Sequence, residues 1–162
     1  MDVTIRSVTP EDVDAVTEIE AKCFPQTEAA AKATFEQRIT AFRDSFFVAV
    51  NGEKIIGFIN GCVINEMAIS DELFCDASLH IPKGDYQTIF GLDVVIEYRN
   101  QGIAAQLLNH LIEASKSAGC KGVILTCKEK LIPYYSKFGF ENKGRSISQH
   151  GGAVWHDMIL KY

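Results

Sequence analysis

The sequence lacks the features that mark membrane-spanning, zinc-binding and dinucleotide-binding proteins. No apolar run approaches the roughly 20 residues that a membrane-spanning helix needs, and the first residues read as a strand rather than a signal peptide. The five cysteines are scattered and include no Cys-x-x-Cys pair, which disfavours zinc and redox sites. No Gly-x-Gly-x-x-Gly follows an expected strand, which disfavours a dinucleotide-dependent oxidoreductase. We therefore expect a protein of the reduced cytoplasm without a bound metal.

The sequence also lacks an excess of positive charge, and it contains no low-complexity tract, internal repeat or obvious linker. Its net charge of −5 argues against nucleic acid and anionic membrane as partners, and it is compatible with a cationic substrate such as an amine. A chain of 162 residues with 47% hydrophobic and 23% charged residues is typical of a globular protein that buries its own core. We expect one domain over residues 1–162.

Apolar periodicity and turn residues predict strands alternating with helices, which is an α/β fold. Asn51-Gly52 between two apolar runs is a strong hairpin signal, and Pro133 indicates that the last helix starts late or bends. The expected elements, in chain order, are a strand near 3–7, a helix over 10–23 that Thr9 caps, a helix over 27–42 that Thr27 caps, strands over 46–50 and 54–64, an irregular loop over 65–85, a strand over 86–95, a helix over 102–118, a strand over 121–127, a helix over 128–138, and a hairpin of 140–146 with 153–160.

The stretch from Gly91 to Ala105 carries the first functional signal. It reads as the end of a buried strand, a short polar turn and the start of a helix. Gly102 has no Cβ, so a ligand can approach its backbone closely, and the first turn of a helix offers N–H groups that have no partner inside the helix. These donors, the helix dipole and the charge of Arg99 make a site for a diphosphate group. By itself the pattern also fits a simpler role, in which Gly102 only allows the turn from strand to helix and Arg99 is a solvated surface charge.

A second motif, Pro133-Tyr-Tyr-Ser-Lys-Phe-Gly-Phe140, follows at the distance of one further strand and helix. Together the two motifs resemble the GNAT superfamily of N-acetyltransferases. Arg99-x-x-Gly102-x-Ala104 matches its acetyl-CoA motif, and the second motif matches its Tyr-x-Lys-x-Gly-Phe signature. Within the superfamily the chain is most similar to the arylalkylamine (serotonin-type) enzymes. That finer similarity rests on Arg-x-Gln-Gly, on residues 125–135 and on Leu79-His-x-Pro82.

The resemblance implies a fold and a cradle for a co-substrate. The fold is a mixed, mostly antiparallel sheet of about seven strands with a central βαβ unit and four main helices, in which the central strand and the next one splay apart. Unpaired backbone groups at the splay would bind the pantetheine of acetyl-CoA. Lys128 stands where many relatives place an asparagine that contacts pantetheine. The implied residues of the acetyl-CoA site are Leu92, Asp93, Val94, Arg99, Asn100, Gln101, Gly102, Ile103, Ala104 and Ala105.

The implied chemistry is direct attack of a primary amine on the thioester of acetyl-CoA. Tyr135 occupies the position of the family's general acid, where it acts as an acid or as a hydrogen-bond donor to the leaving thiolate. The serotonin-type enzymes carry two histidines on the central strand, whereas this chain has Thr88 and Phe90, so neither the histidine relay nor the indolamine substrate carries over. The base stays open between water and several side chains, with Glu66, Glu72, His80 and Asp93 nearby and His150 and His156 more remote.

Three functions stay open at this point. The favoured one is an N-acetyltransferase for a small primary amine, because the loop over 65–85 is placed to cover the acceptor site. The alternatives are an enzyme for peptide or protein amines and a non-catalytic acetyl-CoA sensor, and a homodimer through the sheet edge is also open. Two groups of side chains either line the acceptor pocket or serve the fold alone, the aromatic Phe35, Phe42 and Trp155 and the acidic Asp71, Glu72, Asp76 and Asp85.

Overall fold

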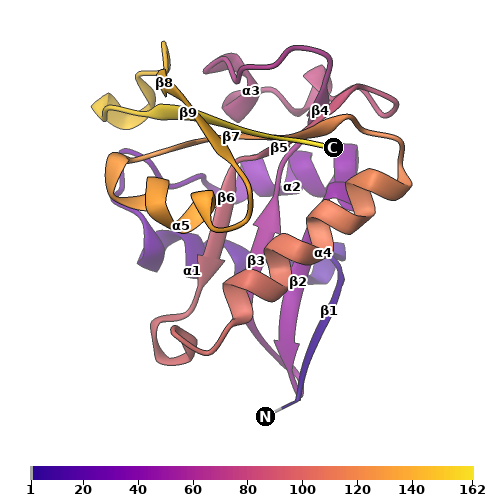
Figure 1. Cartoon of the computed structure of the whole chain (residues 1–162). Helices are drawn as coiled ribbons and strands as arrows, with labels where there is room; N and C mark the ends of the chain where they lie inside the picture. The colour runs from indigo at the N-terminus through magenta and orange to yellow at the C-terminus, as the bar shows by residue number, and fades with distance from the viewer. Residues whose placement is uncertain (1) are drawn as a thin grey trace.

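The strands of the protein form two sheets that meet in the middle of the molecule (Figure 1). The computed structural model describes residues 2–162. The first sheet is antiparallel and has the order β1 (Val3–Ser7), β2 (Phe46–Asn51), β3 (Lys54–Asn60) and β6 (Gly91–Val94). The second sheet has the order β4 (Val63–Ile64), β5 (Tyr86–Ile89), β7 (Gly122–Cys127), β9 (His156–Lys161) and β8 (Glu141–Arg145).

The predicted α/β fold class is confirmed, but residues 2–162 contain nine strands rather than about seven. Two expected strands are each divided between the sheets: the 54–64 strand into β3 and β4, and the 86–95 strand into β5 and β6. The first division falls at Gly61, where a Cβ would lie only 1.9 Å from the Thr88 carbonyl oxygen, so only glycine lets the two backbones pass this closely. The second falls at Phe90, whose N–H donates to the Asn60 carbonyl at 2.7 Å.

Helices α1 (Val13–Cys23) and α2 (Lys32–Phe42) cover one face of the first sheet, and α4 (Ile103–Ser117) covers the other. The single-turn α3 (Glu72–Cys75) and α5 (Ile132–Ser136) lie outside this sheet, and α5 contacts β8. Side chains alternate across a strand, so Phe46 and Val48 pack with α1 and α2, whereas Phe47 and Ala49 pack with α4 (Figure 1). Within residues 2–162, each helix is too short or too polar to cross a bilayer.

The predicted βαβ unit is present as β5, α4 and β7, with β5 and β7 parallel. Gly119, with φ of +87°, ends α4 near the predicted position. The last helix begins only at Ile132, directly before Pro133, as the proline indicated. The predicted start of the second helix at Thr27 is wrong, because α2 begins at Lys32.

The segment between α1 and α2 is held as a turn instead of a helix. The amides of Glu28 and Ala29 both donate to the Pro25 carbonyl at 2.9 Å. The amide of Ala30 donates to Oε2 of Glu20 at 2.9 Å, so a carboxylate from α1 fixes the loop. In a helix that Thr27 caps, this amide would instead have bonded the Thr27 side chain.

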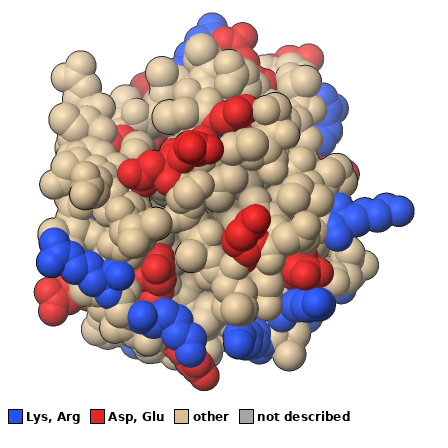
Figure 2. Space-filling model, turned by 90° about the horizontal axis from the view of Figure 1, so that it is seen from above, with Lys and Arg blue, Asp and Glu red and all other residues tan. Residues whose placement is uncertain are grey.

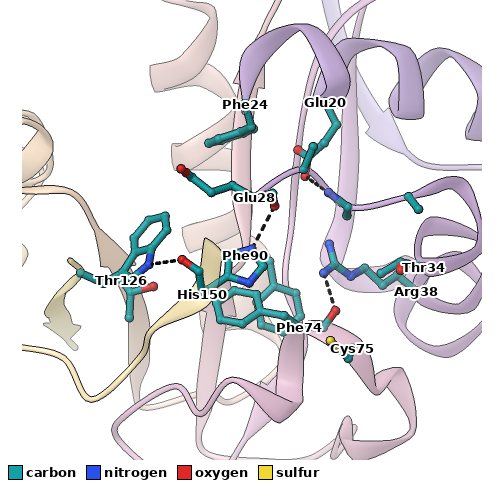
Figure 3. A pocket seen from close by; sticks show the side chains of 14 residues that line it. Glu20, Phe24, Glu28, Thr34, Arg38, Phe74, Cys75, Phe90, Thr126 and His150 are labelled. Carbon is teal, nitrogen blue, oxygen red and sulfur yellow. Dashed lines mark hydrogen bonds between the residues drawn. The ribbon is translucent and has the colours of Figure 1, made fainter. Parts of the chain in front are cut away.

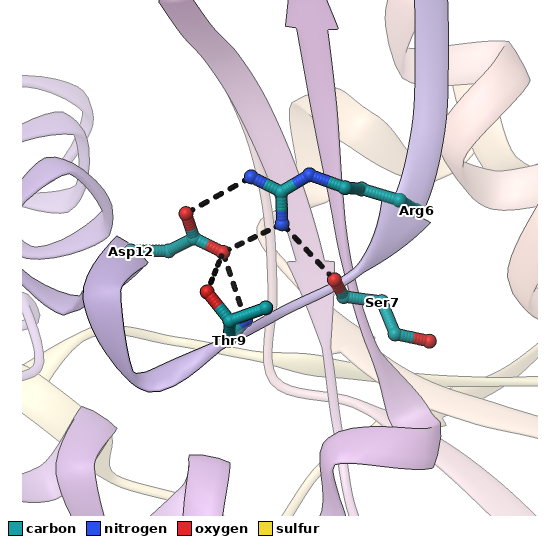
Figure 4. A network of polar contacts seen from close by, with 4 residues as sticks. All are labelled: Arg6, Ser7, Thr9 and Asp12. Atoms are coloured by element: carbon teal, nitrogen blue, oxygen red, sulfur yellow. Dashed lines mark hydrogen bonds and ion pairs between the residues drawn. The ribbon is translucent and has the colours of Figure 1, made fainter. Parts of the chain in front are cut away.

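The first helical segment is capped as predicted, by Thr9 and Asp12 (Figure 4). The Thr9 amide donates to Oδ2 of Asp12 at 2.8 Å. Arg6 forks onto both oxygens of the same carboxylate, at 2.7 and 3.0 Å. Burial works to raise the pKa of Asp12, but the bonds from Arg6 and Thr9 outweigh it and hold that pKa below its ordinary value.

Candidate active site

β6 and β7 diverge at the centre of the molecule, which leaves one edge of β6 unpaired. β5 pairs with β7 from Tyr86–Gly122 to Ile89–Leu125. Beyond that point β7 continues to Cys127 with β9 as its partner, while β6 pairs with β3 alone. Backbone groups of β6 that face β7 are therefore free to bind a ligand as if it were another strand.

The pairing pattern identifies which residues of β6 face the open edge. The Val95 amide donates to the Ile56 carbonyl at 2.9 Å, so Val95 faces β3. Because the direction of backbone groups alternates along a strand, Leu92 and Val94 face away from β3. The Val94 carbonyl indeed accepts from Nε of Arg99 at 3.0 Å.

A cavity of about 750 Å³ extends from this edge to the start of α4 and to α5. All the residues predicted for the acetyl-CoA site line it except Gln101. The side-chain amide of Gln101 donates to the Glu97 carbonyl at 3.4 Å. The other lining residues are Cys23, Phe24, Pro25, Tyr98, Lys128, Lys130, Leu131, Tyr134, Tyr135, Lys137, Phe138 and Trp155. The structure thus brings the two sequence motifs to opposite walls of one cavity.

The start of α4 fits an anionic group. Asn100 and Gly102 have φ of +62° and +83°, the left-handed conformation that opens the turn. A Cβ at Gly102 would meet no protein atom within 4 Å, so a side chain there would enter the cavity. The first bond inside the helix is from the Gln106 amide to the Gly102 carbonyl, at 3.0 Å, which leaves the preceding N–H groups without helical partners. These groups and Arg99 can hold a diphosphate.

Tyr135 lies in the wall of the same cavity, on α5. Its side chain is buried, with the ring packed edge-on against Tyr134 and Phe140. Burial, together with Cys127 and Tyr134, raises the pKa of Tyr135 well above its ordinary value. The hydroxyl therefore keeps its proton and can donate a hydrogen bond.

Figure 3 shows the residues that line a second, smaller cavity of about 270 Å³. Phe24 and Trp155 line both the first cavity and this smaller one. Its wall comes from α1, the α1–α2 loop, α2, α3, the β5–β6 junction, β7 and the segment before β9. The remaining lining residues are Glu20, Glu28, Ala29, Ala30, Ala31, Thr34, Arg38, Phe74, Cys75, Phe90, Thr126 and His150.

Two carboxylates face this smaller cavity with oxygens that have no partner. Oε2 of Glu28 pairs with Nζ of Lys128 at 2.9 Å, and Oε2 of Glu20 holds the Ala30 amide. Oε1 of each is buried without a hydrogen bond. The only lining guanidinium, that of Arg38, is occupied by the Asn60 side chain at 2.9 Å and the Phe74 carbonyl at 3.0 Å.

Aromatic rings line another part of this wall. The ring centroids of Phe90 and Phe74 are 5.1 Å apart, and the His150 ring stacks on Phe74 with the centroids 4.7 Å apart. His150 Nε2 donates to the Glu28 carbonyl at 2.9 Å, and its own carbonyl accepts from the Trp155 indole. Sequence analysis placed His150 far from the site, because the loop before β9 gives no sign of folding back.

The other candidate bases lie outside both linings, apart from Asp93. His80 uses Nδ1 to accept the Val63 amide at 2.9 Å, and burial lowers its pKa. Glu66, Glu72 and His156 line neither cavity. The hydroxyl of Thr88, at one of the two histidine positions, donates to the Cys62 carbonyl at 2.8 Å.

Of the aromatic and acidic groups left ambiguous, only Trp155 lines a cavity. Phe35 and Phe42 are core residues. The acidic side chains serve the loop: Asp71 accepts from the Gln149 amide at 3.1 Å, Asp76 from the Ser78 amide at 3.0 Å, and Asp85 pairs with a lysine. Glu20 was missed, although a charge one residue from Ile19 and four from Val16 on the buried side of α1 was a visible signal.

Comparison with known proteins agrees with this geometry. A sequence profile of the acetyltransferase (GNAT) family matches residues 13–140. A probable glucosamine 6-phosphate N-acetyltransferase 2 of Oryza sativa subsp. japonica is 43% identical over 54 residues, which is 32% of this chain and 32% of that protein. Serotonin N-acetyltransferase of Mesocricetus auratus is 25% identical over 143 residues, 86% of this chain and 68% of that protein.

Among solved structures, the loading GNATL domain of CurA from Lyngbya majuscula superposes with a TM-score of 0.86. It covers 99% of this chain and 98% of the other, at 14% identity. That similarity describes the fold alone. With the first relative, the aligned part spans about a third of the relative's length.

Proposed function

Because this chain belongs to the acetyltransferase (GNAT) family, we propose that it transfers the acetyl group of acetyl-CoA to a small primary amine. One observation carries the proposal: a cavity of about 750 Å³ that fits an extended anionic thioester meets one of about 270 Å³ at a shared wall of Phe24 and Trp155. The larger is of a size usual for a cofactor, and the smaller holds a compact acceptor. The small volume favours a free amine over a folded peptide segment.

The larger cavity would take acetyl-CoA along its backbone groups. The diphosphate would lie at the first turn of α4 with Arg99, and the pantetheine would bond the open edge at Leu92 and Val94. Such backbone donors at the thioester carbonyl stabilise the oxyanion that forms on attack. Lys128 is held by Glu28, so its side chain serves the wall between the cavities in place of the family's asparagine contact.

The smaller cavity favours a cationic amine with an apolar or aromatic body. Its rings, among them Phe74 and Phe90, suit a flat hydrocarbon group, and its two unpartnered carboxylate oxygens attract an ammonium. A sugar phosphate, by contrast, would meet these carboxylates, while Arg38 is occupied. The aromatic wall supports an arylalkylamine above a hexosamine phosphate. Figure 2 shows acidic side chains in a band across the middle of the face seen from above, where they attract cations.

The transfer would proceed by direct attack. The amine must first lose a proton, because an alkyl ammonium has a pKa near about 10. The free nitrogen then bonds to the thioester carbon, and the carbon–sulfur bond breaks as the tetrahedral intermediate collapses. Tyr135 would donate a hydrogen bond to the leaving sulfur, and the second proton lost by nitrogen would end on that sulfur, so that the products are the amide and free CoA.

The test is release of free CoA thiol from acetyl-CoA with a panel of arylalkylamines, polyamines, amino sugars and short peptides. We expect turnover with the arylalkylamines, and Tyr135→Phe should lower kcat on the order of 100-fold. Tyr86→Phe, on β5 and outside both linings, is the matched control. Tight acetyl-CoA binding without turnover on any amine would instead identify a sensor. Turnover on peptides alone would identify a peptide or protein amine as the acceptor.

A further inference from the structure

Asp93 and Glu20 bring two buried carboxyl groups together at the boundary between the two cavities. Glu20 lines the smaller cavity and Asp93 the larger one. Their side chains meet beside Gly91: a Cβ at Gly91 would lie 3.1 Å from Oδ1 of Asp93 and 3.6 Å from Oε1 of Glu20. Glu20 is 7% exposed and Asp93 is 1% exposed, so both side chains are shielded from bulk water.

These carboxyl groups lack the hydrogen-bond donors that two ionised carboxylates require. Oε1 of Glu20 and both oxygens of Asp93 are buried without a partner. Arg38, the nearest cation, directs its two terminal nitrogens to Asn60 and to the Phe74 carbonyl. A single proton held between the carboxyl groups supplies the missing donor and leaves one negative charge to balance Arg38.

The groups around Asp93 also favour its protonated form. The titratable side chains that face it are Glu20 and Cys23 from α1, Arg38 from α2 and Tyr135 from α5. Burial first, and then Glu20, raises the pKa of Asp93 well above its ordinary value, and the attraction of Arg38 does not reverse this. Asp93 is then the member of the pair that carries the shared proton, and Glu20 brings the second carboxyl group to the wall of the acceptor cavity.

We propose that Glu20 is the catalytic base that removes the proton from the incoming ammonium, and that protonated Asp93 is the positioning residue that holds Glu20 in place. This inference rests on the proposed function. Because the Glu20 side chain is buried, transfer of the proton from nitrogen to carboxylate converts two charges into two neutral groups, which burial favours. The nitrogen gains its free electron pair, Glu20 becomes a carboxylic acid, and its proton later leaves to solvent.

The Glu20→Gln change tests the base directly. The glutamine oxygen can still accept the Ala30 amide, so the loop stays anchored, but the variant cannot take a proton. We expect kcat to fall on the order of 100-fold while the KM for acetyl-CoA stays within about twofold. In the variant, kcat/KM for the amine should follow the ionisation of the substrate itself and rise toward a pH of about 10. The control is Glu18→Gln on the exposed side of α1, where Glu18 pairs only with Lys22.

The Asp93→Asn change tests the proton on Asp93, because asparagine resembles the neutral acid. A raised pKa in the folded state means that the wild type loses stability as pH rises from the unfolded value, about 4, through the folded value. Asp93→Asn should remove this loss, so that its melting temperature exceeds that of the wild type increasingly from acid to neutral pH. Its kcat should fall far less than that of Glu20→Gln.

The outcomes separate the two hypotheses. A wild type that turns over no amine overturns the proposed function and the base together. Turnover with an unchanged pH profile and kcat in Glu20→Gln overturns the base alone. A melting temperature difference for Asp93→Asn that does not change with pH overturns the shared proton.

Discussion

The two cavities of the site are built from different parts of the chain. The larger offers the backbone of the open edge of β6 and of the first turn of α4 as binding groups, beside small residues such as Gly102 and Ala104 and a wall of side chains from α5. The smaller is made of side chains that seven separate segments contribute, with charge and aromatic rings in its wall. A backbone site binds a chemically constant ligand, whereas a side-chain site can change its ligand through a few substitutions. The difference explains how one fold can keep its acyl donor while the acceptor varies.

The largest test of this contrast is a side chain placed in the backbone cradle. Gly102→Val should lower acetyl-CoA affinity by more than about 100-fold, because the valine enters the cavity and strains a φ of +83°. Gly119→Val is a matched control, since Gly119 has a φ of +87° with open space around it at the other end of α4. The thermal shift with and without acetyl-CoA measures how much the ligand stabilises each variant. Equal loss of ligand protection in the two variants would mean that strain, not the cavity, is responsible.

A second test acts on the acceptor cavity alone. Glu28→Gln removes a carboxylate whose Oε1 is buried and unpartnered, and it should raise the KM for the amine about 10-fold or more, the value of one hydrogen bond to a charged group. The KM for acetyl-CoA should change less than about twofold. Glu129→Gln, on an exposed residue outside both linings, serves as the control in steady-state kinetics. An equal rise in both KM values would contradict the division between the cavities.

A third test asks how much the cofactor site depends on a side chain at all. Arg99 is exposed, so Arg99→Ala should weaken acetyl-CoA binding about 10-fold at low salt and less at high salt. The KM for the amine should not follow. Titration calorimetry at two salt concentrations measures the effect, with Arg145→Ala on β8 as the control. A loss of the same size as that of Gly102→Val would assign the cradle to Arg99 rather than to the backbone.

The smallest effect on catalysis is expected where neither cavity is touched. Asp12→Ala removes the bonds from Arg6 and Thr9 and should reduce the free energy of unfolding by about 1–3 kcal/mol, with both KM values unchanged. Because the folded-state pKa of Asp12 is lowered, its contribution is complete above about pH 4 and disappears as pH falls through that lowered pKa. Urea unfolding of wild type and variant should therefore converge at low pH. A difference that persists there would show that the charge is not responsible.

The same contrast explains what could be predicted from sequence. The βαβ unit, the hairpin at Asn51-Gly52 and the turn before α4 follow from local signals, and the residues of that turn lie where the motif placed them, with Gln101 as the exception. The acceptor cavity could not be found in this way, because His150 is distant in the chain from Glu20 and Glu28. Only the tertiary fold brings them together.

The division of the central strand between two sheets also escaped prediction. Residues 86–95 were predicted as one continuous strand, and nothing local records that the first half pairs with β7 and the second with β3. Pairing partners are a property of the whole sheet. Gly61 and Gly91 mark the places where the paths change, but a glycine alone does not say which strand it leaves.

Phe24 and Trp155 belong to both cavities, and Lys128 joins the lining of one to Glu28 in the other. Occupation of either cavity therefore changes the wall of its neighbour. By thermodynamic linkage, whatever factor acetyl-CoA adds to the affinity for the amine, the amine adds to the affinity for acetyl-CoA. The shared wall therefore couples the binding of the two substrates. A substitution of Trp155 is the way to measure this coupling free energy.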